Sequence, residues 1–273
     1  MKAILRSAFL ALTVLVAQAV PANAGPFEDG MAAYQREDYA GALKFWQPLA
    51  EQGNADAQNN LGMMHESGQG VPPNFAEAVK WYRKAANQGV AEAQALIGAM
   101  YENGDGIPQD FAEAVKWYRV AAEQGDIGAL LYLGIMNRDG EAAYKRRDYA
   151  TALKIWRPLA EQGVAIAQYS LGVMYHYGRG LPQDFVEAVK WYRKAADQGY
   201  ADAQSDLGVF FIATGQGVPQ DYIIAYMWFD LATAQEGNKK AQIRLDYAAS
   251  LMTPNQIAKA KRMAREWMEK HQQ

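Results

Sequence analysis

The stretch Phe75-Ala-Glu-Ala-Val-Lys-Trp-Tyr-Arg-Lys-Ala-Ala-Asn-Gln-Gly89 decides the fold, because near copies of it occupy residues 111–125 and 185–199. Successive units close on a glycine at intervals of 36, 36, 38, 36 and 38 residues, at positions 53, 89, 125, 163, 199 and 237. Self-similarity at such a period indicates stacked helical repeats. A longer period of 110 residues is superimposed, since residues 32–44 recur as residues 142–154. The sequence therefore predicts a duplicated block of three units.

Each unit is predicted to contain two helices. The apolar residues of the quoted stretch follow the i, i+3, i+4, i+7 spacing of one helix face: Phe75, Ala78, Val79 and Tyr82. Other residues mark the ends of this second helix. Asp110 and Glu113 are spaced as an N-cap residue and its N3 partner, and Gly89 can supply the left-handed residue that follows a helix.

In four units the first helix carries an Ala-Gln pair, at residues 57–58, 93–94, 167–168 and 203–204, followed by a Leu-Gly or Ile-Gly pair. A glycine in mid-helix costs about 1 kcal/mol relative to alanine, so we expect neighbouring helices to approach closely at these positions. The glycines are Gly62, Gly98, Gly134, Gly172 and Gly208.

The repeat is interrupted at three kinds of place. Residues 138–147 replace the usual Gly-x-Gly-Val-Pro loop, which predicts a longer helix or a seam there. Pro48 and Pro158 fall inside second helices and should bend them. Thr253 and Gln256 form a capping-box pattern around Pro254, which predicts a final helix over residues 254–271 that caps the stack.

The motif Ala-Gln-x-x-Leu-Gly-x-Met-Tyr-x-x-Gly-x-Gly-(Val/Ile/Leu)-Pro-x-Asp-(Phe/Tyr) stands at residues 93–111 and 167–185 and, with three changes, at 57–75. These residues resemble the Sel1-like repeat family, a subclass of the tetratricopeptide-like repeats. The resemblance implies an all-α, right-handed α-solenoid of stacked helix-turn-helix repeats, with about six helix pairs in residues 25–273. Because each unit would bury its apolar face on its neighbours, we expect one cooperative, curved solenoid with a concave face.

The first residues have the pattern of a cleavable signal peptide. Lys2 and Arg6 precede the apolar run 8–17, and Ala22-Asn23-Ala24 is a small-x-small cleavage site, so the expected signal peptide is residues 1–24. The alternative of a retained membrane anchor is disfavoured, because the run has about ten residues and a spanning helix needs about 20. Without Lys2 and Arg6 the chain would carry 25 basic and 30 acidic side chains. We therefore expect an acidic, exported protein, periplasmic or secreted, without stable membrane insertion or nucleic-acid binding.

Most catalytic and cofactor chemistries find no support in the sequence. The chain has no cysteine, which excludes thiolate nucleophiles and disulfides, and its three histidines lie in different places of their units. The Gly-x-Gly turns, such as Gly68-Gln-Gly70 and Gly215-Gln-Gly217, lack the strand and lysine of a phosphate loop. We expect a non-enzymatic protein with no cofactor and no metal. Some Sel1-like relatives are credited with β-lactamase activity, so a cell-wall-related or penicillin-interacting hydrolase is the alternative.

Binding requires residues that differ between units. The resemblance to tetratricopeptide repeats implies that first helices line the groove, with the positions two before and two after the Leu-Gly leucine pointing into it. The candidate groove residues on this stripe are Asn59, Met63, Leu131, Ile135, Tyr169, Val173 and His176. The groove would be acidic near the N-terminus and apolar in its middle, which suits an extended peptide or an amphipathic helix of a protein partner. The alternative is that Leu131, Ile135 and Val173 pack under the seam.

Overall fold

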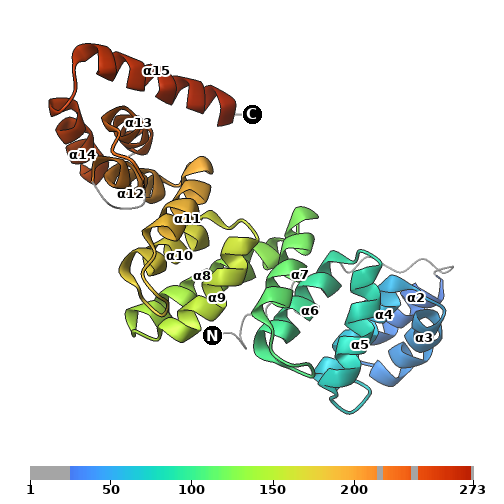
Figure 1. Cartoon of the computed structure of the whole chain (residues 1–273). Coiled ribbons are helices and arrows are strands. Elements are labelled where there is room, and N and C mark those ends of the chain that lie inside the picture. Colours follow the sequence, from blue (N-terminus) through green and yellow to red (C-terminus); the bar gives the residue numbers. More distant parts are fainter. Residues whose placement is uncertain (1–24, 214–217, 235–238, 272–273) are drawn as a thin grey trace. The chain divides into compact units, whose positions relative to one another are not determined.

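The computed structural model describes residues 25–213, 218–234 and 239–271, and these ranges form fourteen helices and no strand (Figure 1). The expected signal peptide and the turn Gly215-Gln-Gly217 lie outside the described residues. The predicted all-α helical-repeat fold is confirmed. The helices are α2 (Pro26–Gln35), α3 (Tyr39–Glu51), α4 (Ala55–Ser67), α5 (Phe75–Asn87), α6 (Ala91–Asn103), α7 (Phe111–Glu123), α8 (Ile127–Lys145), α9 (Tyr149–Glu161), α10 (Ala165–Tyr177), α11 (Phe185–Asp197), α12 (Ala201–Ile212), α13 (Tyr222–Thr233), α14 (Lys239–Ser250) and α15 (Pro254–His271).

The chain divides into two compact units, Met1–Ile135 and Met136–Gln273, with the boundary inside α8. In the first unit each helix from α2 to α7 packs on the next one. In the second unit α9 to α13 follow the same order, and both α14 and α15 pack on α13. The longer helix expected near residues 138–147 is confirmed as the C-terminal part of α8, which has 19 residues. A single cooperative solenoid stays a prediction.

The glycines inside the first helices give room to an aromatic ring of the following helix. A Cβ atom added at these glycines would lie 2.5 to 2.9 Å from a ring carbon, closer than real Cβ atoms come to any neighbour. The pairs are Gly62–Tyr82, Gly98–Tyr118, Gly172–Tyr192 and Gly208–Phe229. All four rings are fully buried, so the contact forms part of the core.

The prediction for Gly134 is wrong, because among the described residues no atom beyond the backbone of its own helix turn lies within 4 Å of a Cβ built there. The close approach in α8 occurs instead at Gly140, where an added Cβ would lie 2.5 Å from Nε1 of Trp156. Gly30 and Trp46 make the same contact 110 positions earlier. Helix α9 therefore packs on the C-terminal part of α8 as α3 packs on α2.

Buried glutamines link the second helix of one repeat to the first helix of the next. Gln94 donates from Nε2 to the carbonyl of Ala86 over 3.1 Å and accepts from Nε2 of Gln124 over 2.6 Å. Gln58 and Gln168 take the same place, with Gln88 and Gln198 as their donors. The recurring Ala-Gln and Gln-Gly pairs thus satisfy polar groups that would otherwise be buried without partners.

The helix ends follow their sequence signals. Oδ1 of Asp110 accepts from the backbone N–H groups of Ala112 and Glu113, at 2.9 and 3.1 Å, as an N-cap should. The carboxylate of Glu113 contacts Nζ of Lys116 on the exposed face of α7. Gly89 has a φ of +93°, the left-handed conformation that ends the second helix.

The irregular positions are also where the sequence placed them. Pro48 and Pro158 lie inside α3 and α9, and the bend that they should cause stays a prediction. Helix α15 begins at Pro254, and its capping box is formed, since N–H of Thr253 donates to Oε1 of Gln256 over 2.8 Å. Trp267 of α15 packs edge-on against Trp228 of α13, with ring centroids 6.1 Å apart.

Candidate peptide-binding pockets

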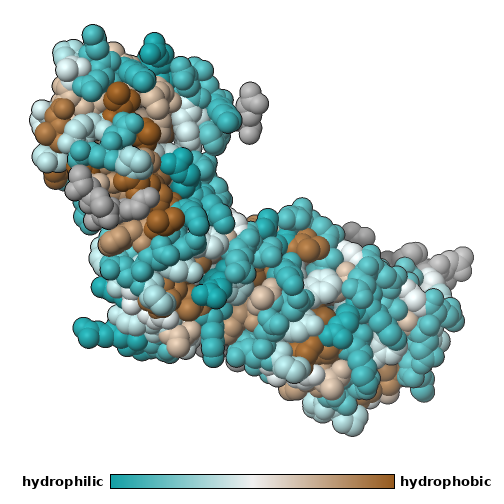
Figure 2. All heavy atoms as spheres, in the orientation of Figure 1, coloured by the Kyte–Doolittle hydropathy of each residue, from teal (hydrophilic) through white to brown (hydrophobic). Residues whose placement is uncertain are grey.

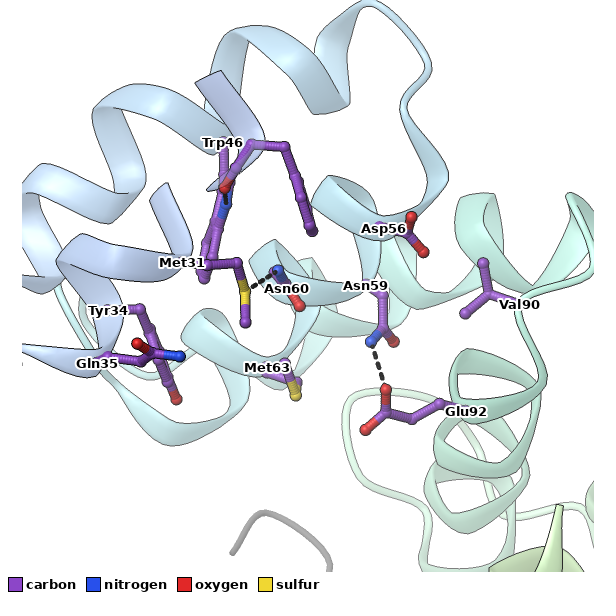
Figure 3. Close-up of a pocket in the computed structure, with 11 residues that line it drawn as sticks. Met31, Tyr34, Gln35, Trp46, Asp56, Asn59, Asn60, Met63, Val90 and Glu92 are labelled. Carbon is purple, nitrogen blue, oxygen red and sulfur yellow. Dashed lines mark hydrogen bonds between the residues drawn. The ribbon is translucent and has the colours of Figure 1, made fainter. Parts of the chain in front are cut away.

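The first unit contains a pocket of about 210 Å³ between α2, α3, α4 and the start of α6 (Figure 3). Four helices position its lining, because α3 and α4 each pack on the preceding helix and α6 starts beside α4. The lining residues are Phe27, Met31, Tyr34, Gln35, Trp46, Asp56, Asn59, Asn60, Met63, Val90 and Glu92.

An aromatic cluster forms one wall of this pocket. The ring of Trp46 lies 5.5 Å from that of Tyr34 and 6.1 Å from that of Phe27, measured between centroids. Nε1 of Trp46 donates to the carbonyl of Phe27 over 3.2 Å, which fixes the indole beneath α2. Gly30 makes this possible, since any Cβ there would occupy the space of the indole. The wall is therefore rigid and apolar.

The other end of the pocket is polar and acidic. Asn59 is only 4% exposed, and its Nδ2 donates to Oε2 of Glu92 over 3.0 Å. Oδ1 of Asn59 is buried and accepts no hydrogen bond from the described residues. Burial raises the pKa of the Glu92 carboxyl, Asn59 opposes that shift, and the negative charges of Asp126 and Asp56 add to it. A carboxylate at this end is thus held in an unfavourable environment.

The second unit contains a pocket of about 360 Å³ in the corresponding place. Each of its lining residues stands 110 positions after a lining residue of the first pocket. They are Asn137, Glu141, Tyr144, Lys145, Trp156, Ile166, Tyr169, Ser170, Val173 and Tyr200. The duplication has therefore produced two copies of one pocket with different side chains.

The second pocket is more aromatic and its charges are paired. Tyr169 stacks at a tilt against Tyr200, with ring centroids 5.2 Å apart. Nζ of Lys145 lies 2.6 Å from Oε1 of Glu141, so these two lining charges neutralise each other. The hydroxyl of Tyr169 donates to Asp206 over 3.1 Å, and burial, followed by the charge of Asp206, raises the pKa of this tyrosine.

Arg244 of α14 completes the polar support of the second pocket. Its Nη1 lies 2.9 Å from Oδ1 of Asp206 and 2.6 Å from Oγ of Ser205. Asp206 is therefore shared between Arg244 and Tyr169, which holds the tyrosine ring in the pocket wall.

Four of the candidate groove residues line these pockets. Asn59 and Met63 line the first, and Tyr169 and Val173 line the second. Leu131 and Ile135 of α8 line neither; Leu131 is 52% exposed, whereas Ile135 is buried at 8%. The exposure of Leu131 goes against its packing under the seam, and packing of Ile135 and Val173 there stays an alternative. A role of any of these residues in binding stays a prediction.

His176 lies beside the second pocket and not in its lining. Its Nδ1 is 3.3 Å from the hydroxyl of Tyr192, and its ring stacks on Tyr177. Burial lowers the pKa of His176, against an opposing effect of the Asp206 charge. In the first unit glutamates occupy this position, and Tyr82 and Tyr118 donate to Glu66 and Glu102. His176 is therefore a core partner of Tyr192.

Sequence reasoning missed the contribution of α2 and α3 to the first pocket. The predicted stripe of groove residues follows the first helices from residue 56 onward, so it does not include Met31, Tyr34 or Trp46. A signal for them was present, because Tyr34 and Trp46 recur as Tyr144 and Trp156 at the 110-residue period.

No helix among the described residues combines the length and the apolarity that crossing a membrane requires. Within the same residues, no group of three or more histidine, aspartate or glutamate side chains is arranged to hold a metal ion. The surface seen in Figure 2 is mainly hydrophilic with separate hydrophobic areas.

The sequence model of the Sel1 repeat matches six successive segments: 27–54, 55–90, 91–126, 127–164, 165–200 and 201–236. The chain therefore belongs to the Sel1 repeat family. Proteins built from these repeats commonly act as scaffolds for protein–protein interactions. No curated protein matches the chain.

Solved structures that are similar to this chain include two Sel1-type proteins. One is a Sel1 repeat protein from Oxalobacter formigenes, 33% identical, with 92% of this chain and 98% of that chain covered and a TM-score of 0.41. The other is c5321, a protective antigen of uropathogenic Escherichia coli strains with an SLR fold, 25% identical, with 90% and 68% covered and a TM-score of 0.49.

Proposed function

We propose that this protein is a non-enzymatic adaptor, exported to the periplasm of a bacterium, that binds a protein or peptide partner through the face formed by its first helices. The observation that carries the proposal is the pair of pockets at equivalent positions of the duplicated block. Each combines an apolar, aromatic wall with a few polar groups, which is the composition of sites that take side chains of a partner.

The family supports the same reading, because Sel1 repeat proteins commonly serve as interaction scaffolds. Export is proposed from the residues that resemble a signal peptide, Lys2, Arg6 and the small residues 22–24. Cell fractionation, with mass spectrometry of the N-terminus, tests it. A protein found in the cytosol with residues 1–24 attached would contradict export.

Site-specific photocrosslinking in the producing bacterium tests the binding face. A photoreactive residue is placed at Gln35, on the exposed rim of the first pocket, or at Lys145, its counterpart in the second. The control position is Lys80, which is exposed on α5 and lines neither pocket. We expect a discrete adduct from Gln35, Lys145 or both, and none from Lys80. Adducts of equal yield from all three positions, or from Lys80 alone, would place the interface elsewhere.

A further inference from the structure

The two pockets share one framework and differ most at the end away from the tryptophan. Asp56 and Asn59 of the first pocket are replaced by Ile166 and Tyr169 in the second. Glu92 lines only the first pocket. Asp202 stands 110 positions after Glu92 but does not line the second pocket. The lining of the first pocket thus has two carboxylates at this end, and the lining of the second has none there.

The acidic end of the first pocket has no basic counterpart. No lysine, arginine or histidine is among its lining residues in the described part of the chain. The one hydrogen bond to the Glu92 carboxylate from a lining residue comes from the neutral amide of Asn59. The second pocket is different, because Lys145 pairs with Glu141 within its lining. The first pocket therefore presents the carboxylates of the exposed Asp56 and the half-buried Glu92 without a basic lining residue, and near Glu92 a cation is bound more strongly than in water.

A second, independent feature points to a donor group. Asn59 is almost fully buried, and its amide points towards Glu92 in the pocket (Figure 3). The nitrogen of this amide is satisfied, whereas the buried Oδ1 accepts no hydrogen bond from the described residues. Buried acceptors without a donor are rare and costly in folded proteins. A ligand with several N–H groups would donate to both carboxylates, and it would reach Oδ1 only if the Asn59 amide turned, because Oδ1 has no exposed surface.

The remaining walls suit a long aliphatic chain. Met31 and Met63 line the pocket between the aromatic wall and the acidic end (Figure 3). Thioether side chains adapt to an inserted chain, and a basic side chain has an apolar stem with a charged tip. The apolar wall would contact the aliphatic stem of a lysine or arginine, and the carboxylates would contact its charged tip.

We propose that the first pocket binds a lysine or arginine side chain of the partner peptide, with the stem against Met31 and Met63 and the charged tip between Asn59, Asp56 and Glu92. The inference rests on the proposed peptide-binding function and adds a specificity to one pocket. The second pocket, with Ile166 and Tyr169 at these positions, selects an uncharged side chain.

Peptide sublibraries test this specificity. The purified protein is immobilised and exposed to acetylated, amidated heptapeptides with mixed flanks and a fixed central residue: lysine, arginine, norleucine or glutamate. Norleucine keeps the stem of lysine and removes the charge. We expect lysine and arginine peptides to be retained about tenfold more than norleucine peptides, equivalent to about 1.4 kcal/mol. The preference should shrink in high salt.

Two sets of variants assign the preference to its residues. Asp56→Asn and Glu92→Gln should remove the selection for the charge and leave retention of norleucine peptides unchanged. Tyr169→Ala, in the second pocket, should leave the preference for lysine and arginine peptides unchanged. Equal retention of lysine and norleucine peptides, or a basic preference that survives both acidic-site substitutions, overturns the inference while peptide binding itself stands. If no sublibrary is retained above an unrelated helical protein, the proposed peptide-binding function fails and the specificity fails with it.

Discussion

At the scale of single residues, the first pocket contains a group that opposes folding. The pKa of Glu92 is raised by burial and by the charges of Asp126 and Asp56, so the folded state holds this proton more tightly than the unfolded state. The free energy of unfolding therefore falls as pH rises from the ordinary glutamate range through the pKa of the folded state. An unfavourable charge of this kind is common at positions where the residue type is selected for binding and not for stability.

Glu92→Gln should raise the free energy of unfolding at pH 7 by about 1 kcal/mol, since the amide carries no charge to be repelled. The gain should disappear at pH 4, where the carboxyl is protonated. Urea unfolding of both proteins at the two pH values measures this. Glu77 is the matched control, because its contact with Lys80 lowers its pKa and Glu77→Gln should give no gain at pH 7. A loss of stability in Glu92→Gln would mean that the carboxylate supports the fold.

The glutamine link between repeats gives a second prediction at this scale. Gln94→Leu should lower the free energy of unfolding by about 1–3 kcal/mol, because it leaves the buried carbonyl of Ala86 without its donor. Gln124→Ala is the control. It removes only the exposed partner of Gln94, so its cost should be below about 1 kcal/mol. Equal costs in thermal unfolding would show that the buried bond to Ala86 contributes little.

At the scale of the elements, α8 shows what a repeat pattern leaves open. The Leu-Gly pair at Leu133 and Gly134 has the form that elsewhere receives an aromatic ring, yet the close contact lies at Gly140. Two periods compete in this helix: the short one aligns Gly134 with Gly98, and the long one aligns Gly140 with Gly30. Packing follows the long period because the indole of Trp156, like that of Trp46, needs the glycine beside it.

Alanine substitutions at two glycines separate these cases. Gly98→Ala should cost about 1–3 kcal/mol, because its Cβ would lie 2.9 Å from the ring of Tyr118, which is fully buried. Gly134→Ala should instead stabilise the protein by up to about 1 kcal/mol, since the site is open and alanine favours the helix. The midpoints of thermal unfolding compare the two. Destabilisation by Gly134→Ala would reveal a close neighbour at that glycine.

The sequence was sufficient for the helices and only partly for the pockets. Local signals such as Asp110, Gly89 and Pro254 act within a few residues, so helix ends could be placed from the chain alone. Each pocket is lined by residues from several helices, and a stripe of residues on the first helices does not include the walls that the other helices supply. Trp46 is therefore not among the residues predicted from the sequence, yet it lines the first pocket.

At the scale of the whole molecule, the question is whether the two compact units unfold together. Their boundary falls at Ile135 and Met136, inside the single helix α8. Breaking a helix in its middle removes hydrogen bonds on both sides of the break. We therefore expect the chain to unfold in one cooperative transition.

Hydrogen exchange in the Gly98→Ala protein tests this cooperativity. The substitution lies in α6 of the first unit, whereas α12 and α13 belong to the second and contain the fully buried Phe210 and Phe229. If the units are coupled, the slowest amides of α12 and α13 exchange only by global unfolding, so they should accelerate by the factor that the loss of global stability predicts. If these amides keep the rates of the unmodified protein while those of α6 accelerate, the units unfold independently. In that case the two pockets belong to separately stable bodies, and a partner that fills both would link them.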